Sequence, residues 1–280
     1  MVDRRSDRTG RGRKAAFAGA AGAGALLGAT ALASPAGAII GGVDATEEYG
    51  FMAALYDDNG AHYCGGSLVD EQWILTAAHC TGPERITVRV GSTDQTRGGS
   101  EREVAEVVEH PEFEMIDVSD DPAYELSAYL LYNDLALLRL DSPVGQTPIG
   151  IADESAAPGA AVRILGWGML DEFGEAGKPD ILQELDTEVV DHDRCAEMDP
   201  DRDLYSQHPT EEAQACTTDS GGPMVRGSEG DWELVGLVSR DGDFDADPLC
   251  VGPSVFTDTA AHADWVLTTV GGGPSGAQRR

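Results

Sequence analysis

The apolar residues of this chain fall in short runs, and the length of these runs restricts the fold more than any other feature. Each run is bounded by Gly, Asp or Pro turns, which is typical of β-strands joined by tight loops. We find no internal repeat and no alternation of strands with helices. The sequence therefore predicts an all-β protein, with strands at Met52–Tyr56, Gly66–Val69, Ile86–Val90, Val104–Val108, Ala136–Leu140, Ala161–Trp167, Glu184–Val190, Met224–Arg226 and Leu234–Val238.

The two ends of the chain differ from this pattern. Residues 1–14 carry six basic side chains, and an uncharged stretch rich in alanine and glycine follows to residue 38. This order predicts a secretory signal peptide at residues 1–38; a membrane anchor is disfavoured because alanine and glycine are only mildly apolar. Cleavage is expected after Ala38 or after Ala33, since each ends a small-x-small triplet. Residues 260–270 are predicted to form a helix and 271–280 a flexible tail.

One loop contains a candidate catalytic nucleophile. Residues 216–223 read CTTDSGGP, and the two glycines and the proline that follow Ser220 favour a sharp turn that exposes its hydroxyl. A serine hydroxyl becomes a nucleophile only when a base takes its proton. Candidate partners lie upstream: His79 in the string WILTAAHC and Asp134 in the string NDLALLRL.

These strings resemble the trypsin/chymotrypsin family of serine proteases, whose triad has this order along the chain. Further matching strings are IIGG at 39–42, CGGSLV at 64–69, GWG at 166–168 and LVS at 237–239. The resemblance implies one peptidase domain at residues 39–270. It also implies two six-stranded antiparallel Greek-key β-barrels with a C-terminal helix, and an active site between the barrels.

The resemblance assigns roles to four side chains. Ser220 would attack a peptide carbonyl while His79 accepts its proton, Asp134 holds the His79 tautomer, and Ser239 supports Asp134. The structural alternatives are a turn serine, a core histidine and a capping aspartate. No cofactor or metal is expected. The remaining histidines lack such contexts and are expected to face solvent: His62, His110, His192, His208 and His262.

The five cysteines suit an exported protein with disulfides. The family resemblance implies two bridges, Cys64 to Cys80 and Cys216 to Cys250. Cys195 has no counterpart at the usual position of its partner. It is expected to be a free thiol, with an intermolecular disulfide or a different pairing as alternatives.

The resemblance also implies an activation ion pair between Ile39 and Asp219. Cleavage after Ala38 would free the Ile39 ammonium, which would pair with the buried Asp219 carboxylate and order the site around Ser220. We therefore expect signal peptidase itself to generate the active terminus. Cleavage after Ala33 would instead leave a propeptide of residues 34–38.

Two features depart from the family pattern. Thr218 stands where a glycine supplies one amide of the oxyanion hole, the other coming from Ser220. A β-branched residue resists the backbone angles that glycine accepts, so the Thr218 peptide is expected to flip and to slow catalysis.

The expected specificity pocket also departs from the family pattern. Gln214 replaces the aspartate at its floor in trypsin-like members, and Ser254 replaces a glycine of its wall. Arg240 and Asp241 follow Ser239, where an aromatic residue and a glycine are typical. The expected substrate side chain is therefore small or medium in size and uncharged.

Acidic residues dominate the expected mature chain, which carries a formal charge of −35 after removal of residues 1–38. This charge argues against partners such as nucleic acid or anionic membranes. The loop between His110 and Asp134 is acidic and is expected to overhang the cleft. The alternating aspartates 241, 243, 245 and 247 only faintly resemble a calcium loop, because Ala246 replaces its turn glycine and Gly252 its glutamate.

The sequence thus predicts a secreted serine endopeptidase, slow or conditional because of Thr218, that acts on proteins or peptides as a monomer. A catalytically impaired homologue that binds other molecules is the main alternative. An esterase-like hydrolase has no specific support. The alanine- and arginine-rich, lysine-poor composition favours a bacterial origin.

Overall fold

A computed structural model of the chain describes residues 39–118, 129–171, 174–192, 199–209, 213–242, 250 and 252–272, together with the backbone of Gln278–Arg279. The expected signal peptide, Cys195 and the aspartates at 243, 245 and 247 lie outside these residues. Among the residues described, no helix has the length and apolar character that crossing a bilayer requires.

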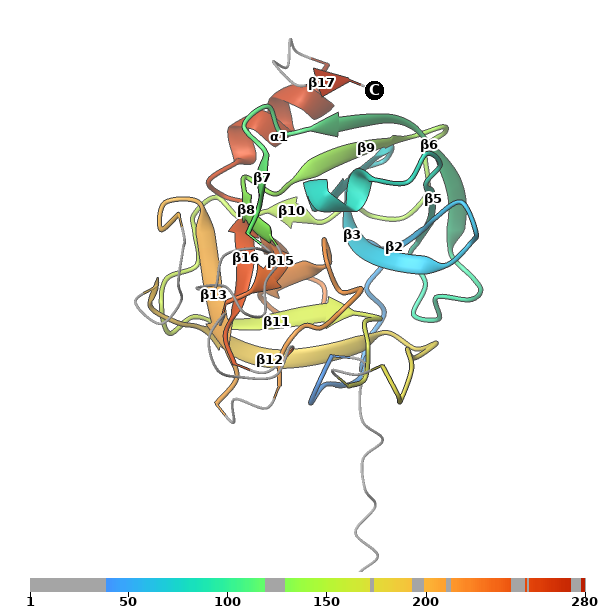
Figure 1. Cartoon of the computed structure of the whole chain (residues 1–280). Helices are drawn as coiled ribbons and strands as arrows, with labels where there is room; N and C mark the ends of the chain where they lie inside the picture. Colours follow the sequence, from blue (N-terminus) through green and yellow to red (C-terminus); the bar gives the residue numbers. More distant parts are fainter. Residues whose placement is uncertain are drawn as a thin grey trace, which may run out of the picture. The chain divides into compact units, whose positions relative to one another are not determined.

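Six antiparallel strands close the first β-barrel (Figure 1). They pair in the order β6-β5-β2-β3-β4-β9, and β9 pairs again with β6. The strands are β2 (Met52–Tyr56), β3 (His62–Asp70), β4 (Trp73–Thr76), β5 (Thr87–Val90), β6 (Ser100–Glu109) and β9 (Ala136–Leu140).

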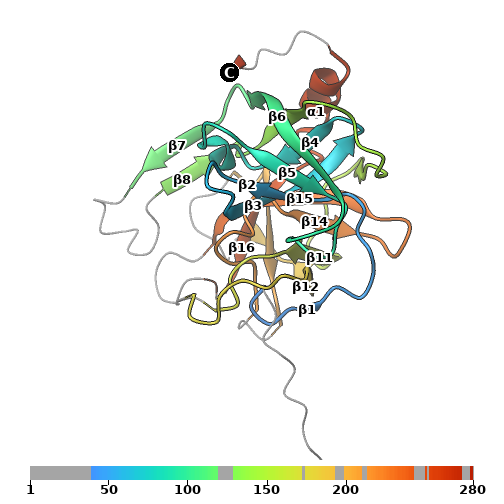
Figure 2. The same cartoon turned by 90° about the vertical axis from the view of Figure 1, so that its right-hand side faces the viewer.

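Two further elements adjoin this barrel. Strands β7 (Glu114–Asp117) and β8 (Tyr129–Tyr132) form a hairpin that extends away from the barrel (Figure 2). The short strand β17 (Gln278–Arg279), within the segment expected to be a flexible tail, pairs with the end of β6.

A second ring of six antiparallel strands also closes into a barrel. Its order is β12-β11-β14-β15-β16-β13, and β13 pairs with β12 to close it. Strand β1 (Val43–Asp44) adds to β12, and β10 (Gly150–Ile151) pairs in parallel with β15. The strands of the ring are β11 (Ala161–Gly166), β12 (Gln183–Val189), β13 (Asp203–Gln207), β14 (Pro223–Arg226), β15 (Glu233–Asp241) and β16 (Ser254–Asp258).

The expected fold of two six-stranded antiparallel barrels with a C-terminal helix is confirmed. The alternation of side chains is visible in β12, where every second residue of its C-terminal half is exposed and the others are buried. The helix, α1 (Ala263–Val270), packs Val266 into the larger core cluster. That cluster lies mostly in the first barrel but includes Leu165 and Leu237 of the second, so the barrels share apolar contacts.

The barrels also meet through their backbones. The Gly65 amide of β3 donates a 2.8 Å hydrogen bond to the carbonyl of Ser220, which precedes β14. A Cβ atom at Gly65 would lie 2.9 Å from the Cα of Gly222, so no side chain fits here. This contact places the Ser220 loop at the junction of the two barrels.

The expectation that the other histidines face solvent is wrong for three of them. His62, His110 and His262 are buried because their rings pack on aromatic neighbours. His62 lies against Tyr56 and Trp167. His192 is exposed, as expected, and His208 is half-buried.

Candidate active site

The Ser220 loop is a series of tight turns. The Asp219 amide donates to the Cys216 carbonyl, and the Gly222 amide donates to the Asp219 carbonyl. Gly221 has a φ of +73°, and a Cβ atom there would lie 2.2 Å from Oγ1 of Thr76. Glycine is therefore required at 221 by both conformation and space, and this geometry presents Ser220 at the end of the loop.

His79 and Asp134 approach each other from the first barrel. His79 lies on the 3₁₀ helix η1 (Ala78–Thr81) after β4, and Asp134 lies in the turn between β8 and β9. The Nδ1 atom of His79 is 2.7 Å from Oδ2 of Asp134, and the His79 amide donates to Oδ1 at 3.0 Å. These two contacts hold the imidazole in one orientation.

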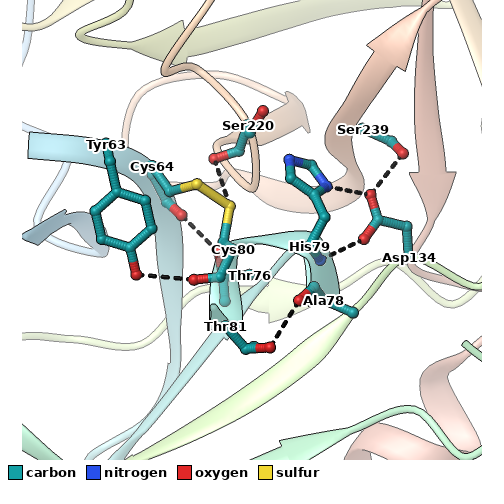
Figure 3. The surroundings of a disulfide bond; sticks show 11 residues. Tyr63, Cys64, Thr76, Ala78, His79, Cys80, Thr81, Asp134, Ser220 and Ser239 are labelled. Carbon is teal, nitrogen blue, oxygen red and sulfur yellow. Dashed lines mark hydrogen bonds and ion pairs between the residues drawn. A yellow bond between two sulfur atoms is a disulfide. The ribbon is translucent and has the colours of Figure 1, made fainter. Parts of the chain in front are cut away.

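The second barrel adds a further donor to this carboxylate. Ser239, on β15, donates through Oγ to Oδ2 of Asp134 at 2.7 Å. In the view of Figure 3, the ring of His79 lies between Ser220 and Asp134. The two barrels thus bring together His79, Asp134, Ser220 and Ser239.

The electrostatics of the pair favour opposite charges. Burial works against a charge on either side chain, but attraction between imidazolium and carboxylate outweighs it. The pKa of His79 is therefore raised and that of Asp134 is lowered. Such an imidazole accepts a proton readily while Asp134 stays ionised.

Both expected disulfides are present beside the site. Cys64–Cys80 joins β3 to the helix that carries His79 (Figure 3). Cys216–Cys250 ties the Ser220 loop to the segment before β16. Each disulfide thus constrains a segment that carries a functional side chain, His79 in the first case and Ser220 in the second.

Thr218 adopts a glycine-like conformation, with a φ of +75°. It is the third residue of the turn that the Asp219 amide closes on the Cys216 carbonyl, a position that favours glycine in type II turns. Its Oγ1 atom is buried and has no hydrogen-bond partner among the described residues. Thr218 thus holds the strained geometry that the sequence predicted it would resist.

Asp219 is completely buried. Its carboxylate accepts hydrogen bonds from the amides of Gly168 and Cys216, at 2.7 and 2.9 Å. Burial nevertheless raises the pKa of Asp219 to about 7. Within the part of the chain that the structure describes, no cationic group pairs with it.

The string GWG provides the space for this carboxylate. A Cβ atom at Gly166 would lie 1.9 Å from Oδ1 of Asp219, and one at Gly168 would lie 2.2 Å from Oδ2. Ile39 is fully buried, and the bridge between Ile40 and Gln214 holds its segment beside the one that leads to Ser220. Ile39 is here in peptide linkage with Ala38.

A cavity of about 150 Å³ opens beside Ser220. Ser239, Asp241 and Ser254 line it, whereas Gln214 is buried behind Ser254. Ser254 Oγ donates to Oε1 of Gln214, whose Nε2 atom lies 3.5 Å from Oδ2 of Asp241. Sequence reasoning noted Asp241 but did not predict the hydrogen bonds that Gln214 and the Cys250 amide donate to its carboxylate, because no signal in the string around it reveals the direction of that side chain.

Arg240 lines the same cavity but directs its guanidinium elsewhere. Its Nη2 atom is 3.0 Å from Oδ2 of Asp203 on β13, and both side chains are buried. The acidic segment after His110 is described in part: it forms the β7–β8 hairpin, and Glu112 pairs with Arg202 at 3.0 Å. Acidic residues 120, 121 and 125 lie outside the described residues.

The sequence profile of the family "Trypsin" matches residues 39–266. A trypsin of Sarcophaga bullata is 30% identical over 248 residues, covering 83% of this chain and 89% of its own length. Trypsin theta of Drosophila melanogaster is 31% identical over 244 residues, covering 82% of this chain and 86% of its own length.

A solved structure supports the same relationship. Neuropsin, described as a serine protease expressed in the limbic system of mouse brain, superposes with a TM-score of 0.64 at 25% identity, covering 79% of this chain and 94% of its own. Fold and comparisons together define a class, the serine proteases of chymotrypsin-like fold. The chain belongs to the trypsin family. Its relatives here are insect proteins, which do not support the bacterial origin expected from composition.

Proposed function

We propose that the chain is a secreted serine endopeptidase that hydrolyses peptide bonds through an acyl-enzyme intermediate. The observation that carries this proposal is the Asp134 carboxylate, which contacts both the ring and the amide of His79 and also accepts from Ser239. A carboxylate placed in this way maintains one tautomer of the imidazole, as general-base catalysis requires.

In this mechanism His79 removes the hydroxyl proton as the oxygen of Ser220 attacks the substrate carbonyl. The proton then passes from His79 to the leaving amine, and the acyl group remains on Ser220. A water molecule then attacks the acyl group in the same way, with His79 as the base, and the carboxylic acid product leaves Ser220. The amides of Thr218 and Ser220 are the proposed donors to the oxyanion.

Activation belongs to the same proposal. Removal of residues 1–38 would free the Ile39 ammonium, and the buried Asp219 carboxylate is the partner that such a charge requires. The paired disulfides suit an oxidising, extracellular location. The acidic chain is proposed to act as a monomer on proteins or peptides and not on nucleic acid.

Thr218 favours a second candidate function. Its positive φ is costly for a β-branched residue, and a collapsed oxyanion hole would leave a family member that binds ligands without cleaving them. The intact contacts of His79, Asp134 and Ser239 oppose this alternative.

Covalent labelling by a fluorophosphonate tests the proposal. The secreted mature protein should react at Ser220, whereas Ser220→Ala should not, across a range of salt concentrations. Sequencing the mature amino terminus should return Ile39. Absence of labelling at every salt concentration would favour the binding protein, and a terminus at Ser34 would contradict activation by signal peptidase alone.

A further inference from the structure

The position of the Asp134 carboxylate depends on the turn that contains it. Asn133 has a φ of +49°, in the left-handed region that asparagine adopts more readily than most residues. The Leu135 amide donates a 2.9 Å hydrogen bond to the Asn133 carbonyl, so Asp134 is the central residue of a three-residue turn. The backbone angles of Asn133 therefore help to set the direction in which the Asp134 side chain leaves the backbone.

Two contacts hold the side chain of Asn133. Its Nδ2 atom donates to the carbonyl of Glu112 at 2.9 Å, and its Oδ1 atom accepts from Nη1 of Arg202 at 2.6 Å. Both ends of the amide are thus engaged, one by the segment before β7 and the other by the second barrel. A rotation of the Asn133 side chain that released the turn would break both hydrogen bonds.

Arg202 is itself fixed to the second barrel. Its amide donates to the Asp199 carbonyl at 3.0 Å, and its carbonyl accepts from the Asp258 amide at 2.9 Å. The Nη1 atom that contacts Asn133 also lies 3.0 Å from Oε2 of Glu112. One guanidinium nitrogen of the second barrel therefore contacts both ends of the β7–β8 hairpin, the segment that enters it and the segment that leaves it.

The charges of Arg202 and Glu112 contribute little to folding stability. Their side chains are 39% and 64% exposed, and such exposed ion pairs are weak because water screens them. The hydrogen bond from Arg202 to Asn133 is partly buried and is screened less. We therefore expect removal of the guanidinium to disturb the turn before Asp134 more than the fold.

The second barrel also holds Asp134 directly. Ser239 donates to its carboxylate, and Oγ1 of Thr257 on β16 donates to its carbonyl at 3.0 Å. These two contacts act on Asp134 itself, whereas Arg202 acts on the preceding residue, whose backbone angles direct the turn. Arg202 does not line the cavity beside Ser220, so substrate binding should not depend on it.

On the basis of the proposed function, we propose that Arg202 is a positioning residue for catalysis. By holding the side chain of Asn133, it maintains the turn that keeps the Asp134 carboxylate in contact with His79. A displacement of a catalytic group by about 1 Å can cost on the order of a hundredfold in rate. The second barrel thus contributes, through Arg202, to the orientation of a carboxylate that the first barrel carries.

Kinetics of variants at Arg202 test the proposal. Arg202→Met removes the donors but keeps a long side chain, so kcat should fall roughly tenfold, the loss expected for one charged hydrogen bond, while KM stays unchanged. Arg202→Lys keeps one donor and should recover part of this loss. The matched control, Arg226→Met, breaks a 3.0 Å ion pair with Glu233 at a similar exposure and should leave kcat unchanged. An unchanged kcat in Arg202→Met, or an effect confined to KM, would overturn the proposal.

A double-mutant cycle tests whether Arg202 acts through Asn133. Asn133→Gly removes the side chain but keeps the positive φ accessible. In that background Arg202→Met should cause little further loss of kcat, because the hydrogen bond between the two side chains is already absent. Independent losses that multiply in the double variant would mean that Arg202 acts by another route and would contradict the proposal.

A measurement without turnover separates this proposal from the proposed function. In Ser220→Ala, NMR of isotope-labelled histidine would follow the titration of His79. Burial opposes the charge of His79 but attraction to Asp134 raises its pKa, so a displaced carboxylate in Arg202→Met should lower that pKa. Loss of the positive charge alone would raise it. A lowered pKa of His79 supports the proposal even if fluorophosphonate labelling of the wild type fails, whereas an unchanged or raised pKa overturns it.

Discussion

At Thr218 the backbone conformation conflicts with the preference of the side chain, because a β-branched residue disfavours a positive φ. A non-glycine residue at a positive φ costs on the order of 1–3 kcal/mol, and a β-branched side chain belongs at the upper end. The surrounding turn, closed by the Asp219 amide on Cys216, supplies the compensation. The same turn is proposed to orient the oxyanion donors, so we expect strain at Thr218 to affect catalysis directly.

Replacing Thr218 by glycine should relieve this strain. We expect Thr218→Gly to raise the free energy of unfolding by roughly 1 kcal/mol or more, because glycine adopts a positive φ without strain. We also expect it to raise kcat, because the backbone amide at 218 can then hold the position of an oxyanion donor without strain. Calorimetry and ester hydrolysis would measure the two effects. Thr217→Gly, at the exposed neighbouring position, is the control and should not raise either quantity. An unchanged or lower kcat in Thr218→Gly would contradict this account.

In the proposed mechanism, Asp134 acts through its charge as well as its position. In Asp134→Asn the negative charge that raises the pKa of His79 is lost, so kcat should fall by about 10⁴-fold. The proposed mechanism requires neutral His79, so activity should be lost as pH falls through the pKa of His79. The acidic limb of the pH–rate profile should therefore move to lower pH in Asp134→Asn.

Ser239→Ala provides a graded comparison with Asp134→Asn. It removes one donor to the carboxylate but keeps its charge, so it should cost far less in kcat. Equal losses in the two variants, measured by the same pH–rate profiles, would be inconsistent with the role given to the charge.

At the scale of elements, three aromatic rings connect the end of β6 to α1. His110 packs edge-on against His262 and Trp265, with ring centroids 4.9 and 5.0 Å apart. Burial lowers the pKa of both histidines to about 4. At His110 the negative charge of Glu112 opposes this lowering of the pKa, and the positive charge of Arg202 adds to it. At His262 the charges of His110 and Arg202 both add to the lowering.

This cluster should make the fold sensitive to acid. Between about pH 6.5 and 4 the unfolded chain binds protons at these histidines and the folded chain does not, so stability falls as pH falls. His262→Phe should reduce the slope by up to about 1.4 kcal/mol per pH unit in urea unfolding. His192→Phe, at an exposed position, should leave the slope unchanged. Identical slopes for wild type and His262→Phe would disprove this origin of the acid sensitivity.

The elements that could be predicted from sequence are those with local apolar signals. All nine predicted runs lie mainly within strands, because each places at least one apolar side chain in the protein interior. Strand β13 was missed because it buries Asp203, Ser206 and Gln207, and the first of these depends on Arg240, distant in sequence. Strand β7 lacks a clear pattern because it is wholly exposed. Strand β8 was not predicted although it buries Leu130 and Leu131.

The residues of the candidate site also divide into those that could be predicted from a local string and those that could not. His79, Asp134 and Ser220 could be found because each lies in a distinctive string. The hydrogen bonds of the Asp241 carboxylate could not be predicted, because they depend on the direction of one side chain and on donors from Cys250 and Gln214.

At the scale of the whole molecule, we expect Asp219 to couple processing to stability. In the uncleaved chain its pKa of about 7 lies above the value of about 4 for an unfolded aspartate. The folded state therefore holds a proton that the unfolded state has lost, and stability decreases as pH rises from about 4 to 7.

Cleavage before Ile39 should remove this decrease, because an ammonium beside the carboxylate favours its charged form. We expect the mature protein to be more stable than the uncleaved chain at pH 7, with the difference shrinking towards pH 4. Urea unfolding of both forms would measure this. The comparison should be repeated with Asp219→Asn, in which the dependence on cleavage should largely disappear; parallel pH profiles of the two natural forms would refute the coupling.

The hydrogen bond from Gly65 to Ser220 joins two barrels that each close on themselves. An intermediate in which both barrels have formed but have not docked would contain nearly all the strand pairing of the native protein and no assembled nucleophile. Exchange of the Gly65 amide proton with solvent deuterium would distinguish that intermediate from the native state, because this proton is protected only after docking. Catalytic competence is then expected to be among the last properties that the folding chain acquires.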